Sequence, residues 1–476
     1  MYIPVIGLEI HAQLSTESKM FASDSTQFGS EPNTQISTIT LGHPGILPKT
    51  NKKAIEFGIK MGLACNGKIN QVMIFDRKNY FYPDLPKGYQ LTQDKTPVCI
   101  GGGIEIKNPQ GESRTIKLNR IHIEEDAGKS MHQDGDDTLV DLNRAGVPLI
   151  EIVTEPDIHS SEEAGLVLME VRRIVQYLEI CDGNMEEGSL RCDANVSVKK
   201  QGDTKLGKKV EIKNMNSFRN VQRAIDYEIR RQIQELDDGE EIISETRTFD
   251  ANTGKTYGMR TKEELNDYRY FPDPDLSPVH VSDEWLEEIR KKMPPLPKEL
   301  TQKLIGEYGL PEYDANILTE TKELANYYLS VCRYTKSYKT ASNWIMGPVK
   351  SYLNENNVNI SEFPLSSEKL GRIIQYIDEK IISHDSAIKQ IYPELLRNPD
   401  LDLDAYIRDK SLDEAIDSEH IEQLIEKVLS EYPDKVEAYK KGKKGLIGLF
   451  VGEVMKRTKG KADPQKANTL LREALK

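Results

Sequence analysis

The segment IGLEIHAQL at residues 6–14 alternates apolar residues with polar or charged ones. In a β-strand, consecutive side chains point to opposite faces. The isoleucines and leucines would therefore lie on one face, and Glu9, His11 and Gln13 on the other. This period of two predicts a strand of an antiparallel sheet that is apolar on one face and polar on the other.

Several other segments share this alternation. In SLRCDANVSV at 189–198, Arg191, Asp193 and Asn195 occupy the polar face. Shorter versions occur at 121–124 (IHIE), 150–152 (IEI) and 210–213 (VEIK). Together these strands predict an antiparallel sheet with one face rich in carboxylates, imidazole and guanidinium.

The polar face of this predicted sheet has two interpretations. Any antiparallel sheet with one face in water alternates in the same way. Solvated sheet faces usually carry Thr, Lys and Ser, however, whereas this face carries Glu, His, Asp, Asn and Arg. Carboxylates with an occasional imidazole are ligands for Mg²⁺ or Mn²⁺. A solvated face and a metal or phosphate site both stay open at this point.

The organisation of the whole chain follows from its length and its prolines. A chain of 476 residues exceeds one ordinary hydrophobic core, so we expect several domains. The run MPPLP at 293–297 interrupts any helix or strand, and a second break falls near 398–400. We therefore predict an α+β fold with a mixed domain at 1–292, a helical domain at 293–405 and a small helical domain at 406–476.

The charge of the chain is acidic overall but unevenly distributed. The net charge of -13 argues against a nonspecific nucleic-acid binder, which needs clustered cations. Residues 435–476 nevertheless hold twelve Lys and Arg against four Asp and Glu. This segment is either a solvated helical surface or a site for a polyanionic partner.

The cysteines and the hydropathy of the chain indicate its compartment. Five cysteines are scattered without a short motif, which is typical of free thiols in a reducing cytosol. No apolar run reaches the roughly 20 residues that span a bilayer, and the start of the sequence does not resemble a secretory signal. We therefore expect a cytoplasmic protein that does not bind membranes.

Two segments interleave aromatic residues with cations. They are DRKNYFYPDLPKGYQ at 76–90 and DYRYFPDPD at 267–275. Such segments suit an adenine or another base stacked beside phosphates, but they also occur as loops held by buried aromatic rings. The GKS at 128–130 is not a P-loop, because Ile123 stands where the first glycine is required. The sequence also lacks the elbow motif of a serine hydrolase.

At these motifs the chain resembles the B subunit of the GatCAB-type amidotransferases, the GatB/GatE family. The resemblance runs nearly from end to end, and the basic C-terminal region is similar to the YqeY-like tail of the family. Its motifs are GLEIHAQL (7–14), FDRKNYFYPDLPKGYQ (75–90), HIEEDAGKS (122–130), DLNRAGVPLIEIVTEPD (141–157), EEGSLRCDANVSV (186–198), EIKNMNSF (211–218) and DYRYFPDPDL (267–276).

The resemblance implies a fold and a division of labour. The fold would be a cradle domain with antiparallel sheet, then a helical domain and a YqeY-like tail that contacts tRNA. An amidase A subunit would release ammonia from glutamine, and a small C subunit would join the other two. The B subunit would use ATP and Mg²⁺ to phosphorylate the side-chain carboxylate of misacylated Glu-tRNA(Gln) or Asp-tRNA(Asn). Ammonia would then displace the phosphate.

The resemblance also implies candidate site residues. In a regular strand Glu125 would point away from Glu124, so its place in the metal site requires the strand to end or bulge there. The predicted metal ligands are Glu9, His11, Glu125 and Glu211, followed by Glu124 and Asp193. Glu125, Glu211, Arg191 and Lys213 are the predicted catalytic residues. Lys78, Tyr80, Tyr82, Lys87, Tyr89, Asn195 and Arg269 are predicted to bind ATP or the aminoacyl end.

One departure from the family pattern concerns zinc. Many members carry four cysteines of a zinc knuckle early in the cradle domain, and the matching positions here hold no cysteine. Structural zinc takes four ligands, and one aspartate cannot replace them. We therefore predict no zinc. The four positions are Ala22, Asp24, Ser37 and Thr40.

Two other functions compete with the ligase interpretation. The chain could be a noncatalytic tRNA-binding scaffold whose carboxylates form a structural polar face. It could also be a metallohydrolase that uses His11 and His122, although the sequence contains no H-E-x-x-H pair. Dependence on MgATP separates these alternatives from an enzyme that forms an acyl phosphate.

Overall fold

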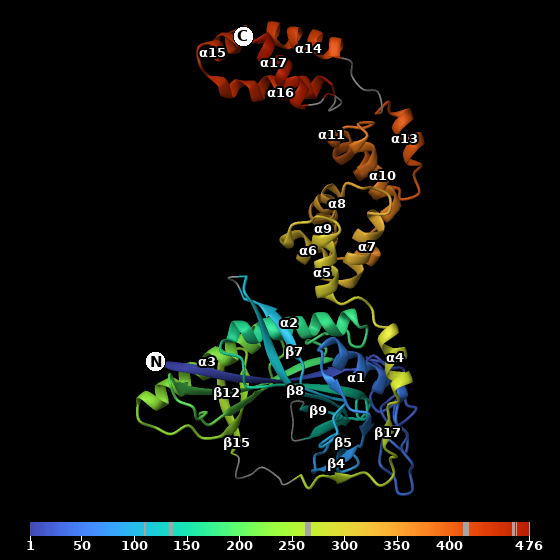
Figure 1. The fold of residues 1–476 in the computed structure, drawn as a ribbon, viewed down its shortest axis with the longest axis vertical. Helices are drawn as coiled ribbons and strands as arrows, with labels where there is room; N and C mark the ends of the chain where they lie inside the picture. Colours follow the sequence, from blue (N-terminus) through green and yellow to red (C-terminus); the bar gives the residue numbers. More distant parts are fainter. Residues whose placement is uncertain are drawn as a thin grey trace. The chain divides into compact units, whose positions relative to one another are not determined.

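The computed structural model describes residues 1–108, 111–132, 137–261, 268–412, 418–458, 462 and 464–475. The chain divides into two compact units, Met1–Pro297 and Lys298–Lys476, which Figure 1 shows in sequence colours. Asp267 of the second aromatic segment lies outside the described residues, as do Lys459, Lys461, Asp463 and Lys476 of the basic C-terminal segment.

The first unit is built on a large sheet, as the alternating segments predict. Its strand order is β15-β14-β13-β12-β1-β11-β8-β6-β2, with β7 paired to β8. In the described part of the chain, β13 and β14 pair in parallel and the other pairs of this sheet are antiparallel. The strands are β1 (Tyr2–Gln13), β2 (Lys68–Ile69), β6 (Cys99–Ile100), β7 (Gly103–Lys107), β8 (Ser113–Glu125), β11 (Pro148–Thr154), β12 (Leu190–Lys200), β13 (Val210–Lys213), β14 (Glu245–Asp250) and β15 (Lys255–Thr261).

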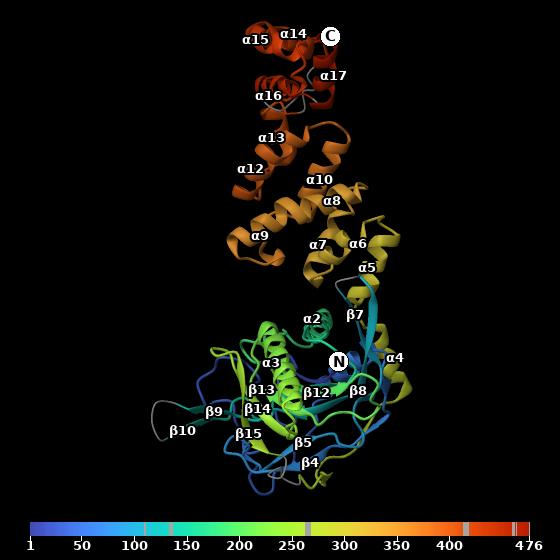
Figure 2. The same cartoon turned by 90° about the vertical axis from the view of Figure 1, so that its left-hand side faces the viewer.

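Two long helices cover the apolar face of this sheet. They are α2 (Ser161–Tyr177) and α3 (Phe218–Asp237) (Figures 1 and 2). Each begins at a serine whose hydroxyl accepts a hydrogen bond from a backbone N–H three residues later, which stabilises the first turn. Their apolar side chains share one core with the buried residues of β1, β11 and β12. The opposite, polar face of the sheet therefore remains available for a site.

The remaining elements of the first unit surround the sheet. The first aromatic segment forms β4 and β5, and the second supplies β16, so that the two pair as one small sheet. Arg77 Nε donates to Asp273 Oδ2 over 2.6 Å and joins them. The elements that surround the large sheet are α1 (Lys52–Ala64), β3 (Val72–Met73), β4 (Asp76–Asn79), β5 (Tyr89–Thr92), β9 (Lys129–His132), β10 (Thr138–Asp141), β16 (Phe271–Pro272), β17 (Val279–His280) and α4 (Asp283–Lys291).

The second unit is helical in its described residues. One apolar cluster extends from Leu304 to Leu412 around Trp344, and another from Ile421 to Leu475. The domain boundaries stay predictions, although Leu403, Ile407 and Leu412 pack into the first of these clusters. The α-helices are α5 (Pro297–Gly306), α6 (Glu312–Leu318), α7 (Lys322–Val331), α8 (Tyr338–Trp344), α9 (Lys350–Asn356), α10 (Ser367–Asp378), α11 (His384–Ser386), α12 (Tyr392–Arg397), α13 (Leu403–Asp409), α14 (Ser418–Glu431), α15 (Pro433–Lys440), α16 (Ile447–Arg457) and α17 (Pro464–Ala474).

Two expectations from the sequence, free cysteines and no membrane-spanning segment, can be compared with the structure. All five cysteines are free thiols, and four of them are buried. Burial raises the pKa of Cys99 to about 11 and that of Cys181 to about 12, so these thiols are protonated at neutral pH. Within the described residues, each helix is too short or too polar to cross a bilayer.

Candidate active site

The register of the sheet lines up functional side chains in one row. On β1, His11 pairs with Arg191 of β12 on one side and with Glu151 of β11 on the other. Glu151 in turn pairs with His122 of β8. Directly paired residues point to the same face of a sheet. Four strands that are distant in sequence thus place a guanidinium, two imidazoles and a carboxylate side by side.

Neighbouring rows add further carboxylates to the same face. Glu9 pairs with Asp193, and Asn195 pairs with Glu211. Glu124 lies two residues beyond His122 on β8, opposite Leu149. The alternation of each strand and the register between strands together produce the polar face.

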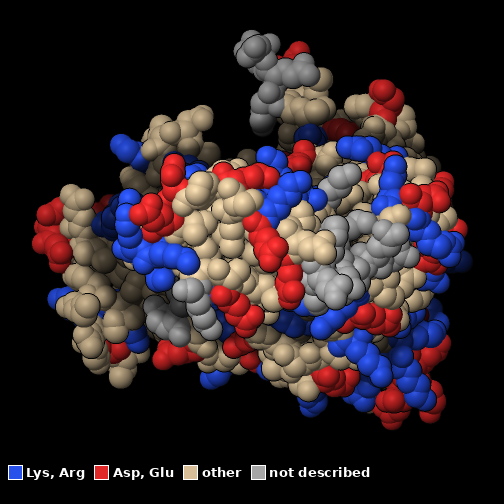
Figure 3. Space-filling view, turned by 90° about the horizontal axis from the view of Figure 1, so that it is seen from above, with Lys and Arg blue, Asp and Glu red and all other residues tan. Residues whose placement is uncertain are grey.

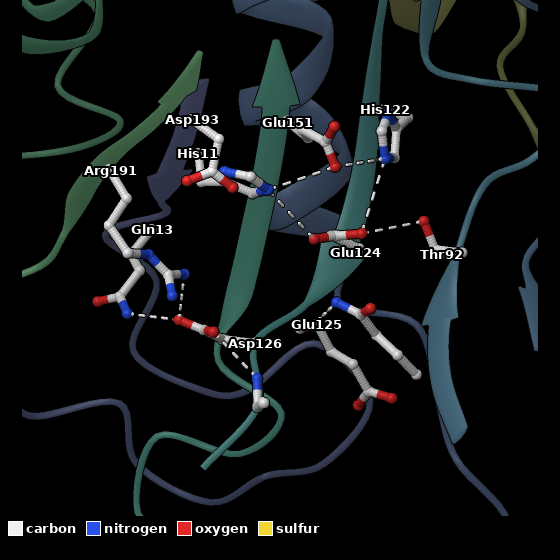
Figure 4. A network of polar contacts seen from close by, with 12 residues as sticks. His11, Gln13, Thr92, His122, Glu124, Glu125, Asp126, Glu151, Arg191 and Asp193 are labelled. Carbon is white, nitrogen blue, oxygen red and sulfur yellow. Dashed lines mark hydrogen bonds and ion pairs between the residues drawn. The ribbon is translucent and has the colours of Figure 1, made fainter. Parts of the chain in front are cut away.

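His11, Glu124 and Glu151 converge at the centre of this face (Figure 4). Their nearest ligand atoms all lie within 4.8 Å of one another. His11 Nε2 is 3.4 Å from Glu151 Oε2 and 4.0 Å from Glu124 Oε1. On the other side, His122 Nε2 is 3.2 Å from Glu151 and 3.6 Å from Glu124. We call His11, Glu124 and Glu151 the central cluster.

The electrostatics of the central cluster keep its carboxylates ionised. Burial alone would raise the pKa of Glu151, but His122 and His11 hold it well below its ordinary value. Burial opposes a charged His122, yet Glu151 and Glu124 outweigh this effect and raise its pKa to about 9. Two carboxylates and one imidazole are a donor set that suits Mg²⁺ or Mn²⁺. The residues present therefore fit a divalent cation.

A second acidic group lies on β1, β12 and β13 and contains its own cation. Lys213 Nζ donates to Asp193 Oδ2 over 2.5 Å and lies 2.9 Å from Glu211 Oε1. Asn195 Nδ2 donates to Glu9 Oε1 over 2.9 Å. Burial disfavours the charged Lys213, but Asp193 and Glu211 raise its pKa. This lysine neutralises part of the negative charge beside the central cluster.

A pocket of about 990 Å³ opens over the polar face. Its walls come from the large sheet, from β4 and β5, and from the residues just before β16. Near Tyr268, the Lys78 ammonium lies 4.9 Å from the ring centroid, and the rings of Tyr80 and Tyr270 meet that of Tyr268 edge-on. Ten of the predicted site residues line this pocket: Glu9, His11, Lys78, Tyr80, Glu124, Arg191, Asp193, Asn195, Glu211 and Lys213.

The structure places Glu125 away from the central cluster. β8 pairs with β11 in regular register from Arg120 to Glu125, and the strand ends at Glu125, which pairs with Pro148 without a bulge. The carboxylate is buried, accepts a hydrogen bond from Leu91 N over 2.9 Å and pairs with Lys87. In Figure 4 it points away from His11. Neither Glu125 nor Lys87 is among the described residues that line the pocket.

Three more predicted residues lie outside the described lining of the pocket. Tyr82 is 62% exposed. Tyr89 lies against the guanidinium of Arg77, whose Cζ is 4.3 Å from the ring centroid. Arg269 is exposed and adopts a positive φ of 43°.

Glu151 is not among the site residues predicted from the sequence. Its segment, IEI at 150–152, shows the right alternation but is short. Only the pairing of His11 with Glu151 and of Glu151 with His122 brings it to the centre of the face. Strand register is a long-range property, and one sequence does not reveal it.

Three of the four positions that match the zinc knuckle are joined by hydrogen bonds. Asp24 Oδ2 accepts hydrogen bonds from the Ser37 backbone N–H over 3.1 Å, from Ser37 Oγ over 2.8 Å and from Thr40 Oγ1. Ala22 contributes no ligand atom. One carboxylate and two hydroxyls make a poor zinc site, which normally has four Cys or His ligands. The residues present do not fit structural zinc.

Comparison with known proteins shows the family of the chain. Residues 4–287 match the family model of the GatB/GatE catalytic domain, and residues 326–475 match that of the GatB domain named for YqeY. Similar curated proteins are named as the B subunit of an aspartyl/glutamyl-tRNA(Asn/Gln) amidotransferase. The protein of Thermodesulfovibrio yellowstonii is 50% identical over 100% of this chain and 99% of its own length. Those of Syntrophotalea carbinolica and Caldanaerobacter subterraneus are each 48% identical over 100% of this chain and 98% and 99% of their own lengths. The chain therefore belongs to the GatB/GatE family.

Proposed function

We propose that the chain is the subunit of a glutamine-dependent tRNA amidotransferase that activates the misacylated amino acid. Its substrates are ATP and Glu-tRNA(Gln), Asp-tRNA(Asn) or both. The product of the complete reaction is Gln-tRNA(Gln) or Asn-tRNA(Asn). The observation that carries this proposal is the central cluster of His11, Glu124 and Glu151 at the floor of a pocket lined by lysine and arginine.

The reaction needs activation because a carboxylate is a poor acyl donor to ammonia. An oxygen of the side-chain carboxylate attacks the γ-phosphorus of ATP, the bond to the bridging oxygen of ADP breaks, and an acyl phosphate forms. Ammonia then attacks the acyl carbon, inorganic phosphate leaves, and loss of a proton yields the amide. Bound Mg²⁺ would supply charge neutralisation on the phosphates. His11, Glu124 and Glu151 are the residues that would hold it.

The cations of the pocket counter the repulsion between the two anionic reactants, ATP and the substrate carboxylate. Both reactants are anionic, so their approach requires positive charge that is already in place. Lys78, Arg191 and Lys213 line the pocket around the central cluster. We assign Lys78, Tyr80 and Asn195 to binding of ATP or the aminoacyl end, and Arg191 and Lys213 to the transferring groups. Glu9, Asp193 and Glu211 would provide further acidic ligands.

The predicted roles of the outlying residues are revised accordingly. We replace Glu125 by Glu151 in the proposed metal site. Lys87 then serves to neutralise the buried Glu125, and Tyr89 packs against Arg77. For Tyr82 and Arg269, both exposed, binding of ATP or the aminoacyl end stays the prediction.

The proposed partners are an amidase A subunit, a small C subunit and tRNA. The tail supports tRNA binding through exposed Lys440, Lys441, Lys443 and Lys444. Figure 3 shows Lys and Arg side chains interspersed with Asp and Glu on the face in view. A chain ending at residue 412 should bind tRNA more weakly, with a flatter salt dependence. The free thiols support a cytoplasmic location.

The Glu124→Ala variant tests the proposed function in the assembled amidotransferase. MgATP-dependent amide formation should fall by about 100-fold or more, whereas tRNA affinity should stay unchanged. Glu155→Ala is the matched control, because Glu155 follows β11 but does not line this pocket among the described residues. Unchanged turnover in Glu124→Ala would support the scaffold alternative instead.

A further inference from the structure

Arg191 is fixed at the pocket by a buried carboxylate that the proposed mechanism does not use. Arg191 lies on β12 beside His11. Its Nη2 donates to Asp126 Oδ2 over 2.7 Å. Asp126 comes directly after the end of β8 and also lines the pocket. Figure 4 shows this contact next to the central cluster.

The Asp126 carboxylate is itself held by several donors. Its residue is only 4% exposed. Gln13 Nε2 donates to the same Oδ2 over 2.7 Å, and Ala127 N donates to Oδ1 over 3.0 Å. Arg144 Nε also lies 3.7 Å from Asp126 Oδ2. These donors hold the carboxylate in a fixed orientation.

Arg144 fixes the loop that carries Asp126. Its Nε donates to Ala127 O over 2.9 Å, and its Nη2 donates to Gly128 O over 2.6 Å. A Cβ at Gly128 would lie 2.9 Å from the carbonyl oxygens of both Asp84 and Asp141, so this backbone is tightly enclosed. The loop therefore offers Asp126 as a rigid support.

The guanidinium of Arg191 retains donor capacity for a ligand. A single hydrogen bond joins it to Asp126, in contrast to the bidentate pairs that commonly immobilise arginine for structure alone. Its Nε is buried, and no hydrogen-bond partner lies within reach in the part of the chain that the structure describes. A buried N–H without a partner is costly, and an oxyanion in the pocket would satisfy it.

We propose that Asp126 is a positioning residue that orients the Arg191 guanidinium toward an oxyanion of the substrate. The oxyanion is either the side-chain carboxylate of the aminoacyl group or a phosphoryl oxygen of ATP, since both match the guanidinium fork. This inference rests on the proposed function and adds to it the element that sets the geometry of Arg191. Asp126 does not touch the reacting atoms.

The first test compares Asp126→Asn and Asp126→Glu with Arg191→Lys in the assembled amidotransferase. Asparagine keeps the shape of aspartate but removes the charge and one acceptor oxygen. We expect Asp126→Asn to lower kcat/KM by roughly 10- to 100-fold and Asp126→Glu to recover part of that loss. A raised KM for misacylated tRNA in both Asp126→Asn and Arg191→Lys identifies the carboxylate as the ligand. A raised KM for ATP identifies the phosphoryl oxygen.

The second test is chemical rescue by guanidinium. Millimolar guanidinium should restore part of the activity of Arg191→Ala, because Asp126 can hold the free ion in place of the side chain. The same addition should fail in the Arg191→Ala variant that also carries Asp126→Asn. A purely structural pair predicts that neither variant responds.

Asp314→Asn is the matched control. Asp314 is also 4% exposed and accepts hydrogen bonds from a cation, Lys339, and a neutral donor, Ser342. It belongs to the second compact unit. This variant should lower thermal stability about as much as Asp126→Asn while leaving kcat/KM unchanged.

Two results would overturn the inference. One is full activity of Asp126→Asn while Arg191→Lys is impaired. The other is equal rescue of Arg191→Ala by guanidinium with and without Asp126. In both cases the proposed function itself would still stand, because it depends on the separate loss of MgATP-dependent turnover in Glu124→Ala.

Discussion

The two faces of the large sheet differ in how they use the same strands. On β1, Ile10 is fully buried against the helices, while His11 points into the pocket. On β8, Ile123 belongs to the core and Glu124 to the central cluster. One face supplies the folding free energy through apolar burial. The other gathers charges at a cost in electrostatic free energy that the ion pairs of the site offset in part.

This contrast teaches that the function resides in one set of alternate residues and stability in the other. Neighbouring residues should therefore respond differently to the same truncation. Glu125 is an exception to this separation of function and stability between alternate residues. It follows Glu124 directly, is buried and paired with Lys87, and so combines a charge with a structural location.

The largest effect is expected for His11→Ala. Removing the imidazole deletes one of three ligand groups of the central cluster. MgATP-dependent amide formation should fall by about 100-fold or more, with little change in the midpoint of chemical denaturation. Steady-state kinetics on the assembled complex measure the first quantity, and far-ultraviolet circular dichroism measures the second. Normal turnover in the His11→Ala enzyme would contradict the claim that the polar face of the sheet carries the function.

The neighbouring variant Ile10→Ala should behave in the opposite way. Ile10 is 0% exposed and packs in the core. Its truncation should destabilise the first unit by about 2–5 kcal/mol through lost burial and a residual cavity. The fraction that remains folded should keep normal kcat and normal dependence on MgATP. Loss of kcat in fully folded Ile10→Ala protein would show that the two faces are not separable.

A smaller effect concerns Lys19, a charge buried near Glu125. Burial lowers the pKa of Lys19 to about 8, although Asp24 and Glu125 counteract the shift. The unfolded chain therefore binds more protons than the folded protein between pH 8 and the ordinary lysine pKa of about 10.4. Over this window the contribution of Lys19 to stability should rise with pH. Denaturation midpoints at several pH values should show this slope in the natural chain and a flatter one in Lys19→Met.

Much of the fold could be predicted from local patterns. The alternation at 6–14 and 189–198 predicted β1 and β12. This signal is local, because side-chain direction in a strand depends on neighbouring residues. The same alternation placed Glu9, His11, Asp193 and Glu211 on one face.

The arrangement of the site depended on contacts that are distant in sequence. Glu151 reaches the centre only through the register of β11 with β1 and β8. The expected place of Glu125 in the metal site came from family resemblance and required the strand to end or bulge there. The strand does end at Glu125, but the buried carboxylate pairs with Lys87. The support of Arg191 by Asp126 joins two segments 65 residues apart. Pairing of this kind follows from the whole fold and cannot be read from one strand.

The most direct test of the central claim is a structure of the assembled amidotransferase with Mn²⁺ and a non-hydrolysable ATP analogue. Anomalous scattering would locate the ion without ambiguity. The account predicts an ion coordinated by His11, Glu124 and Glu151, with the phosphates of the analogue beside it. An ion bound at Glu125, or held elsewhere in the pocket without His11 and Glu151, would contradict it.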